Sequence, residues 1–139
     1  MRTLRILAIT LGTCALGVSF PALAAKATLV STLNGANETA GGDPDGTGNF
    51  TVDIDTDSGD FCYTLTGTKI AKPTMAHIHS GAAGANGAPV ITIEVASDMC
   101  VAVDPEVLKA IVAAPGSYYV NIHTADFPAG AIRGQLAAK

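Results

Sequence analysis

Three histidines are the residues of this 139-residue chain best suited to chemistry. His77 and His79 stand two residues apart in MAHIHSG, and His123 follows in YVNIHTADFPAG. Side chains two apart in a β-strand share a face, so the pair would project together while Ala76 and Ile78 face the core. Neutral imidazole binds copper and zinc well, and three imidazoles leave one coordination position open for water or a small ligand. The spacing therefore suggests a metal site, with copper as the first choice and zinc as the second.

A later segment repeats this pattern. Tyr119, Asn121 and His123 would share one face of a strand, and Val120 and Ile122 the opposite face. If the two strands are neighbours, all three histidines converge. A plainer alternative stays open: each histidine could hydrogen-bond backbone or a carboxylate and so order the loop after its strand, because an isolated His-x-His is a weak motif.

Short alternating segments bounded by Gly, Pro, Asp and Asn are typical of antiparallel β structure. The predicted strands are 26–33, 47–55, 60–67, 75–79, 90–95, 117–123 and 131–137. One short helix is expected around 105–113, with Asp104 as its cap and Pro105 in its first turn. The predicted fold is an all-β, Greek-key antiparallel β-sandwich.

Two motifs resemble ligand-binding loops without meeting their requirements. The aspartates of VDIDTDSGD resemble the start of a calcium loop, but the glycine falls at the seventh place and Thr64 stands where a bidentate glutamate is needed. A solvated hairpin turn is therefore favoured over a calcium site. The glycine-rich segment from Gly81 to Gly87 lacks a following helix, so a flexible connection is favoured over a phosphate-binding loop.

The first 24 residues have the features of a secretory signal peptide. Arg2 and Arg5 precede an apolar run that ends in a small-x-small sequence, and cleavage is expected after Ala24. Lipidation at Cys14 is a less favoured alternative, since the downstream site is better. We therefore expect a secreted or extracytoplasmic protein, residues 25–139, with one domain and no membrane span.

Charge and cysteine content limit the possible partners. Two of the 8 basic residues lie in the predicted signal peptide. The mature chain would therefore carry 6 basic and 12 acidic residues, a formal charge of −6. Nucleic acid is not an expected partner of such an acidic chain. Cys62 and Cys100 are expected to form a disulfide in an oxidising compartment, although paired thiolate metal ligands are an alternative. Closing this loop of 38 residues would stabilise the fold by roughly 4 kcal/mol in the chain-entropy description.

The segments AHIHSGAAGANGAPVI and YYVNIHTADFPAGAIRGQL resemble the CHRD domain family, named for its occurrence in chordin. The resemblance runs from about Leu29 to Leu136, and both motifs are long and specific. It implies an extracellular β domain, in the short form found in secreted bacterial proteins, and it implies no defined activity. Many members carry glutamate before Ile-Arg-Gly, where this chain has Ala131, so any role of that carboxylate is absent here.

The order of elements is more distantly similar to the Cu,Zn superoxide dismutase scaffold. That similarity implies His77, His79 and His123 as copper ligands and Arg133 as a cation that guides an anionic substrate. Arg133 could instead pair with an aspartate or with backbone carbonyls, and Asn121 is expected to hydrogen-bond a neighbouring loop. Three histidines in the whole chain exclude a two-metal dismutase.

The favoured functional hypothesis is a non-catalytic extracellular binding module, with an unknown partner and a three-histidine metal site. The alternative is a copper-dependent, superoxide-dismutase-like redox enzyme. A hydrolase built from Asp98, Asp104 and Asp126 has no support, because nothing in their spacing brings these carboxylates together.

Overall fold

The computed structural model describes residues 25–139; the predicted signal peptide, with Cys14, lies outside them. Within this range the strands are β1 (Lys26–Asn34), β2 (Thr47–Asp55), β3 (Asp60–Thr68), β4 (Pro73–Ser80), β5 (Pro89–Ile93), β6 (Met99–Ala102), β7 (Tyr118–Thr124), β8 (Ile132–Gln135) and β9 (Ala137–Ala138). The helices are α1 (Pro105–Ala113) and two short 3₁₀ turns, η1 (Gly35–Asn37) and η2 (Pro115–Ser117).

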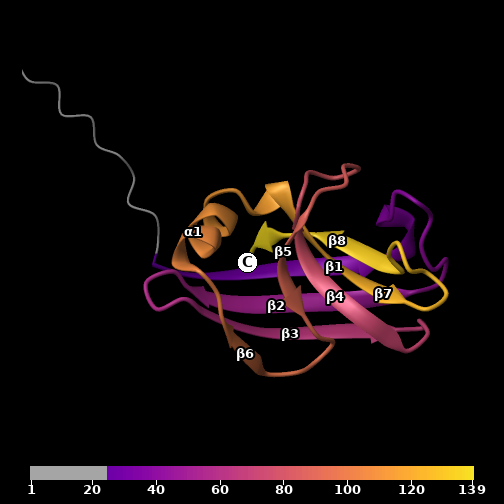
Figure 1. Ribbon diagram of the computed structural model, residues 1–139, viewed down its shortest axis with the longest axis horizontal. Coiled ribbons are helices and arrows are strands. Elements are labelled where there is room, and N and C mark those ends of the chain that lie inside the picture. The colour runs from indigo at the N-terminus through magenta and orange to yellow at the C-terminus, as the bar shows by residue number, and fades with distance from the viewer. Residues whose placement is uncertain (1–24) are drawn as a thin grey trace, which may run out of the picture.

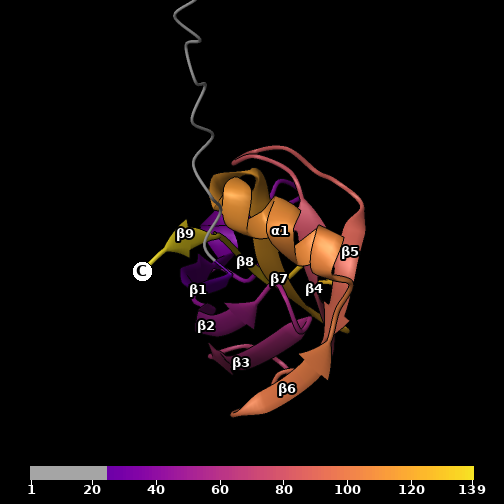
Figure 2. The same ribbon diagram turned by 90° about the vertical axis from the view of Figure 1, so that its left-hand side faces the viewer.

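All nine strands of the described chain belong to one antiparallel sheet, ordered β5-β4-β7-β8-β1-β2-β3-β6, with β9 beside β1. The sheet curls into a half-barrel, so that its two arms face each other across a common core (Figures 1 and 2). The prediction of an all-β fold with one short helix is confirmed. The order also places β4 directly beside β7, which is the pairing that the histidine site requires.

Alternating side chains explain how the arms share one core. In the hairpin of β2 and β3, Val52 pairs with Tyr63 and Ile54 with Phe61, and all four side chains are buried. Asp53, between the two aliphatic residues of β2, is exposed. This period of two sends one face of the sheet inward and leaves the other face to polar residues.

Helix α1 lies at one end of the curled sheet (Figure 2). The Asp104 side chain caps it by accepting a hydrogen bond of 2.9 Å from the Glu106 amide, and Pro105 occupies the first turn, as expected. Leu108 and Ile111 are completely buried in the core cluster. The helix is thus attached to the sheet through its apolar face.

Two features of the sheet differ from the sequence prediction. The strand predicted over 131–137 is divided, because the Leu136 amide donates to the Tyr118 carbonyl and the chain then leaves β7 to pair with β1 as β9. Strand β6 was not predicted, since four residues are too few for a period of two to be read. Its register on β3 places Cys100 directly opposite Cys62.

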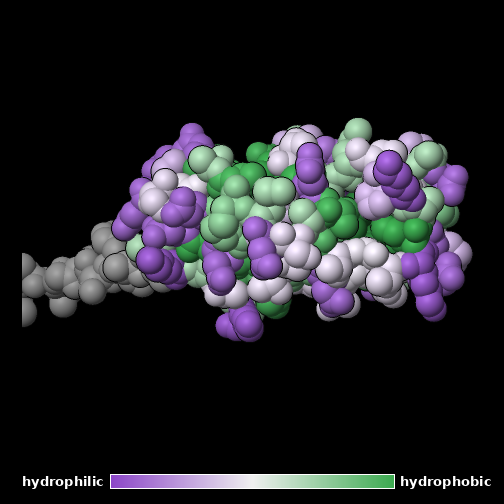
Figure 3. All heavy atoms as spheres, turned by 90° about the horizontal axis from the view of Figure 1, so that it is seen from below, coloured by the Kyte–Doolittle hydropathy of each residue, from purple (hydrophilic) through white to green (hydrophobic). Residues whose placement is uncertain are grey.

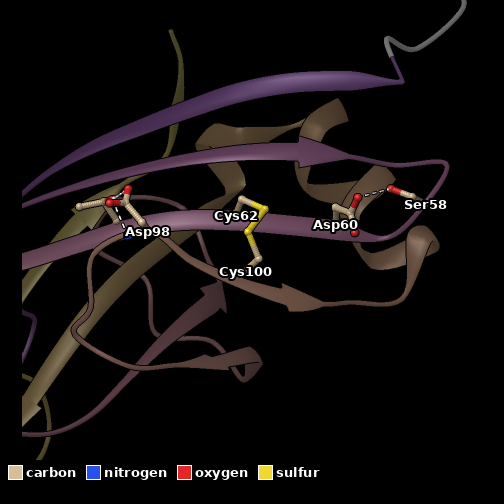
Figure 4. Close-up of a disulfide and its surroundings, with 6 residues drawn as sticks. Ser58, Asp60, Cys62, Asp98 and Cys100 are labelled. Atoms are coloured by element: carbon tan, nitrogen blue, oxygen red, sulfur yellow. Dashed lines mark hydrogen bonds between the residues drawn. A yellow bond between two sulfur atoms is a disulfide. The ribbon is translucent and has the colours of Figure 1, made fainter.

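The predicted disulfide joins Cys62 and Cys100 and ties β6 to β3 (Figure 4). Beside it, the Asp98 amide donates a 3.2 Å hydrogen bond to the Thr64 hydroxyl. The edge strand is therefore held by a covalent link and by its ladder with β3.

The surface carries few large apolar side chains. Seen from below, apolar residues lie among hydrophilic ones (Figure 3). Of the described residues, the large apolar ones that are most exposed are Met75, Val90 and Met99. No helix within residues 25–139 combines the length and the apolar character that crossing a bilayer requires.

Candidate metal centre

The three histidines come together on the outer face of the sheet, where β4 lies beside β7. In the ladder of these strands His77 is opposite Asn121 and Met75 is opposite His123, while Ala76 and Ile78 are buried on the core side. The ring centroid of His77 lies 5.2 Å from that of His79 and 5.1 Å from that of His123. The centroids of His79 and His123 are 6.4 Å apart. The convergence expected from the alternation of side chains is therefore present.

Hydrogen bonds to backbone carbonyls orient two of the rings. Nδ1 of His79 lies 2.9 Å from the Gly87 carbonyl oxygen, and Nδ1 of His123 lies 3.0 Å from that of Pro128. A carbonyl oxygen can only accept, so each Nδ1 carries the hydrogen of the neutral ring and each Nε2 keeps its lone pair. Such carbonyl partners are the usual means of fixing the tautomer of a metal-binding histidine.

One nitrogen of each ring faces the interior of the cluster. Nε2 of His123, whose ring hydrogen is on Nδ1, accepts a 3.2 Å hydrogen bond from Nδ1 of His77. Nε2 of His79 is buried without a hydrogen-bond partner among the described residues. One nitrogen from each ring lies within 4.8 Å of the other two. Metal–nitrogen bonds of about 2.0–2.1 Å would need a nitrogen spacing of roughly 3.3–3.4 Å in a tetrahedral site. The set fits a metal ion after a contraction of about 1.5 Å or less, which ring rotations can supply.

Burial favours the neutral form of His77 and His79. It lowers the pKa of His77 below its usual value, and the neighbouring rings of His123 and His79 lower that pKa further. Burial also lowers the pKa of His79, against the opposing effect of its hydrogen bond to Gly87. Neutral imidazole is the metal-binding form, so these shifts leave the site ready for an ion at neutral pH.

Tyr119 and Arg133 support the cluster from the side of β8. The Tyr119 ring stacks on His79 with a centroid distance of 4.8 Å and an interplanar angle of 4°. The guanidinium carbon of Arg133 lies 3.3 Å from the centroid of the same tyrosine ring, a cation–π contact. Tyr119, on the strand between them, thus links the arginine to the histidine.

The remaining donors of Arg133 hold the loop between β4 and β5. Nη1 donates to Oδ1 of Asn86 at 3.0 Å, and Nη2 donates to the carbonyl oxygens of Ala85 and, at 3.5 Å, Ala82. Gln135 adds a 2.7 Å hydrogen bond to the Gly81 carbonyl. Arg133 is buried, and its contacts match the interpretation in which it pairs with backbone carbonyls. The loop expected to be a flexible connection is fastened to the sheet at several points.

Gly87 allows this loop to reach His79. A Cβ atom at this position would collide with the carbonyl oxygen of Ser80, so a side chain would push the loop away. The Gly87 carbonyl could then no longer accept from His79. The glycine-rich segment therefore matters because its backbone approaches the strand closely.

A buried acid lies near the histidines without joining them. Glu38 follows η1, and its Oε1 is buried with no hydrogen-bond partner within residues 25–139. Burial raises the pKa of Glu38 to about 7, although the charge of Arg133 and the side chain of Asn121 lower it. Oδ1 of Asn121 is likewise buried without a partner in the described chain. The Asn121 side chain thus affects the pKa values of both Glu38 and His79.

The other sequence-predicted site residues lie apart from this cluster. Among residues 25–139, the aspartates of the β2–β3 turn do not belong to a group that could hold a metal ion. Oδ1 of Asp55 instead accepts hydrogen bonds from the amides of Asp57 and Ser58, as in a solvated turn.

Glu38 was not predicted as a site residue, because it lies in an irregular segment where no periodicity shows which way its side chain points. Tyr119 was placed on the correct face, but nothing in its type indicated a stacking role.

Comparison with known proteins identifies the family of this all-β domain. The CHRD domain family matches residues 29–136, most of the chain, so the chain belongs to the CHRD domain family. No curated protein and no solved structure matches the chain with significance. The family match supports a non-catalytic extracellular module, and it leaves the partner unspecified.

Proposed function

We propose that this protein is an extracellular CHRD module that binds one copper ion through His77, His79 and His123. The observation that carries the proposal is the set of three imidazole nitrogens within 4.8 Å of one another, two of them on rings whose tautomers are set by carbonyl partners. Nε2 of His79 is buried and makes no hydrogen bond of good geometry within residues 25–139, so a bound ligand would satisfy it. A metal ion is the ligand that suits three imidazole nitrogens gathered at one point.

Copper is preferred to zinc on chemical grounds. An imidazole set accepts both metals, and at a given site Cu(II) binds more tightly than Zn(II) in the Irving–Williams order. The metal would be held by Nε2 of His79 and His123, whose Nδ1 atoms are engaged by carbonyls, and by Nδ1 of His77, after the hydrogen of that ring moves from Nδ1 to Nε2. When bound, copper could exchange an electron or be passed to a partner.

Binding without catalysis fits the surroundings of the site better. An anion-guiding role for Arg133 requires free donors, yet its guanidinium is buried and hydrogen-bonded to Asn86, Ala82 and Ala85. Only 9% of His79 and 8% of His123 are exposed, which leaves approach to the site mainly over His77. We therefore favour a copper-binding module over a dismutase-like enzyme.

Titration of the purified protein, prepared without a histidine tag, tests this proposal. We expect one equivalent of Cu(II) to bind with an imidazole-rich electron paramagnetic resonance spectrum, and His123→Ala to abolish that spectrum. Thr92→Ala is the matched control, because Thr92 is exposed opposite His77 on β5 and offers no imidazole. Absence of binding, or equal binding by the His123 variant, would refute the site.

Two further measurements address the alternatives. Superoxide turnover by the copper-loaded protein that exceeds that of its His123→Ala variant would establish the redox enzyme instead of the binding module. Mass spectrometry of exported protein should show a mature chain that begins near Ala25, as the proposed signal peptide predicts.

A further inference from the structure

Met75 is an exposed methionine beside the metal centre. The sequence Met75-x-His77-x-His79 places three side chains in one row on β4, since residues two apart share a face. Met75 is 50% exposed, the highest value among the large apolar residues that reach the surface of the described chain. Its exposure means that its thioether is free to approach a ligand.

The strand pairing places Met75 within reach of the histidines. It is directly opposite His123 in the ladder of β4 and β7, and such cross-strand neighbours have Cβ atoms about 4.5–5.5 Å apart. Along β4 the distance to His77 is about 6–7 Å, two residues of strand rise. Methionine has three rotatable bonds and no branch, so its sulfur can be turned toward a metal held between the two rings.

We propose that Met75 supplies a thioether as the fourth ligand, so that the site holds Cu(I) as well as Cu(II). This inference rests on the proposed copper site. Thioether sulfur is a soft donor that favours Cu(I), whereas three imidazoles alone accept Cu(II) and Zn(II). One methionine thus selects copper over zinc and retains the ion in its reduced state.

The position of Met75 gives the site an entrance as well as a ligand. His79 and His123 are nearly buried, whereas Met75 and the less buried His77 mark the open side of the cluster. A copper ion would therefore meet the thioether first on entering and would leave it last. Such an arrangement suits a protein that takes up copper from one partner and gives it to another.

Competition titration against a chromophoric Cu(I) chelator, under anaerobic reducing conditions, tests the inference. Met75→Leu keeps the size of the side chain and removes the sulfur ligand. We expect it to weaken Cu(I) binding by at least about tenfold and to change Cu(II) and Zn(II) binding by less than about threefold. Met99→Leu is the matched control, because Met99 is 37% exposed and lies on β6, at the opposite edge of the sheet from β5.

X-ray absorption of the Cu(I)-loaded wild-type protein gives an independent measurement that does not depend on a variant. We expect a sulfur scatterer in the first coordination shell that disappears in Met75→Leu. Equal Cu(I) affinity of wild type and Met75→Leu, or a shell of nitrogen and oxygen only, would overturn the role of Met75 while leaving the histidine site in place. If the wild type bound neither Cu(I) nor Cu(II), the proposed function itself would fail, and this inference with it.

Discussion

The buried acid Glu38 should make the stability of this protein depend on pH in a direction that one substitution removes. Burial raises its pKa from 4.5 to about 7, so the folded protein holds a proton that the unfolded chain releases. A group with a raised pKa contributes its full stability below pH 4.5 and loses that contribution as the pH rises to about 7. Ionisation of Glu38 therefore destabilises the fold at neutral and alkaline pH.

The size of the effect follows from the two pKa values. The difference between 4.5 and about 7 corresponds to about 3 kcal/mol at 1.36 kcal/mol per pKa unit. This is a large share of the 5–15 kcal/mol that is typical of a domain. The pKa values of His77 and His79 are lowered, so their contribution has the opposite sign: it is present above pH 6.5 and is lost as the pH falls.

Glu38→Gln isolates the acid from the histidines. Urea unfolding of wild type and variant, with chelator present, should be followed from pH 4 to pH 8. We expect the free energy of unfolding of the variant, relative to wild type, to rise by about 3 kcal/mol across this range, with most of the change complete by pH 7. Parallel curves for the two proteins would mean that Glu38 titrates equally in the folded and unfolded states, which would contradict a pKa raised by burial.

Three other predictions follow from the described contacts. Replacing Cys62 and Cys100 by Ala should lower the free energy of unfolding, measured by urea denaturation, by about 4 kcal/mol, because the disulfide closes a loop of 38 residues. A loss under about 1 kcal/mol would contradict this chain-entropy estimate. Arg133→Lys should speed amide hydrogen exchange at Ser80 and Gly81 and lower the free energy of unfolding by about 2–4 kcal/mol. Lysine cannot hydrogen-bond several acceptors of the loop and also stack on Tyr119. Unchanged exchange would show that the arginine does not hold the loop. Copper affinity, measured by calorimetry, should be nearly constant from pH 8 down to 6.5 and then fall, since the lowered pKa values of His77 and His79 keep these two ligands neutral above that pH. A loss that is already complete at pH 7 would argue against these two histidines as ligands.

The sheet and the histidine face could be predicted because both depend on a period of two. Val52 and Ile54 alternate with aspartates, and His77 and His79 alternate with Ala76 and Ile78, so the sequence alone indicates which side chains share a face. The convergence of His123 needed one further condition, that its strand be a neighbour of β4. Alternation cannot establish that condition, because strand order is decided by long-range pairing.

Most of the surroundings of the site could not be predicted for the same reason. Pairing of Arg133 with backbone carbonyls was one of two alternatives, but the loop it would contact was not indicated. Glu38 and Gly87 come from different loops, and their contacts depend on how the chain folds over the same face. Strand β6 is a second example, since its four residues owe their pairing to the disulfide and to the register on β3. Local patterns carry no information about either arrangement.

A crystal structure of the protein grown with copper would show whether the three histidines share one ion. We expect an ion bound by Nδ1 of His77 and by Nε2 of His79 and His123, with the carbonyl contacts of Gly87 and Pro128 preserved. An ion bound at another place, or a well-ordered cluster of the three histidines without an ion at saturating copper, would contradict it.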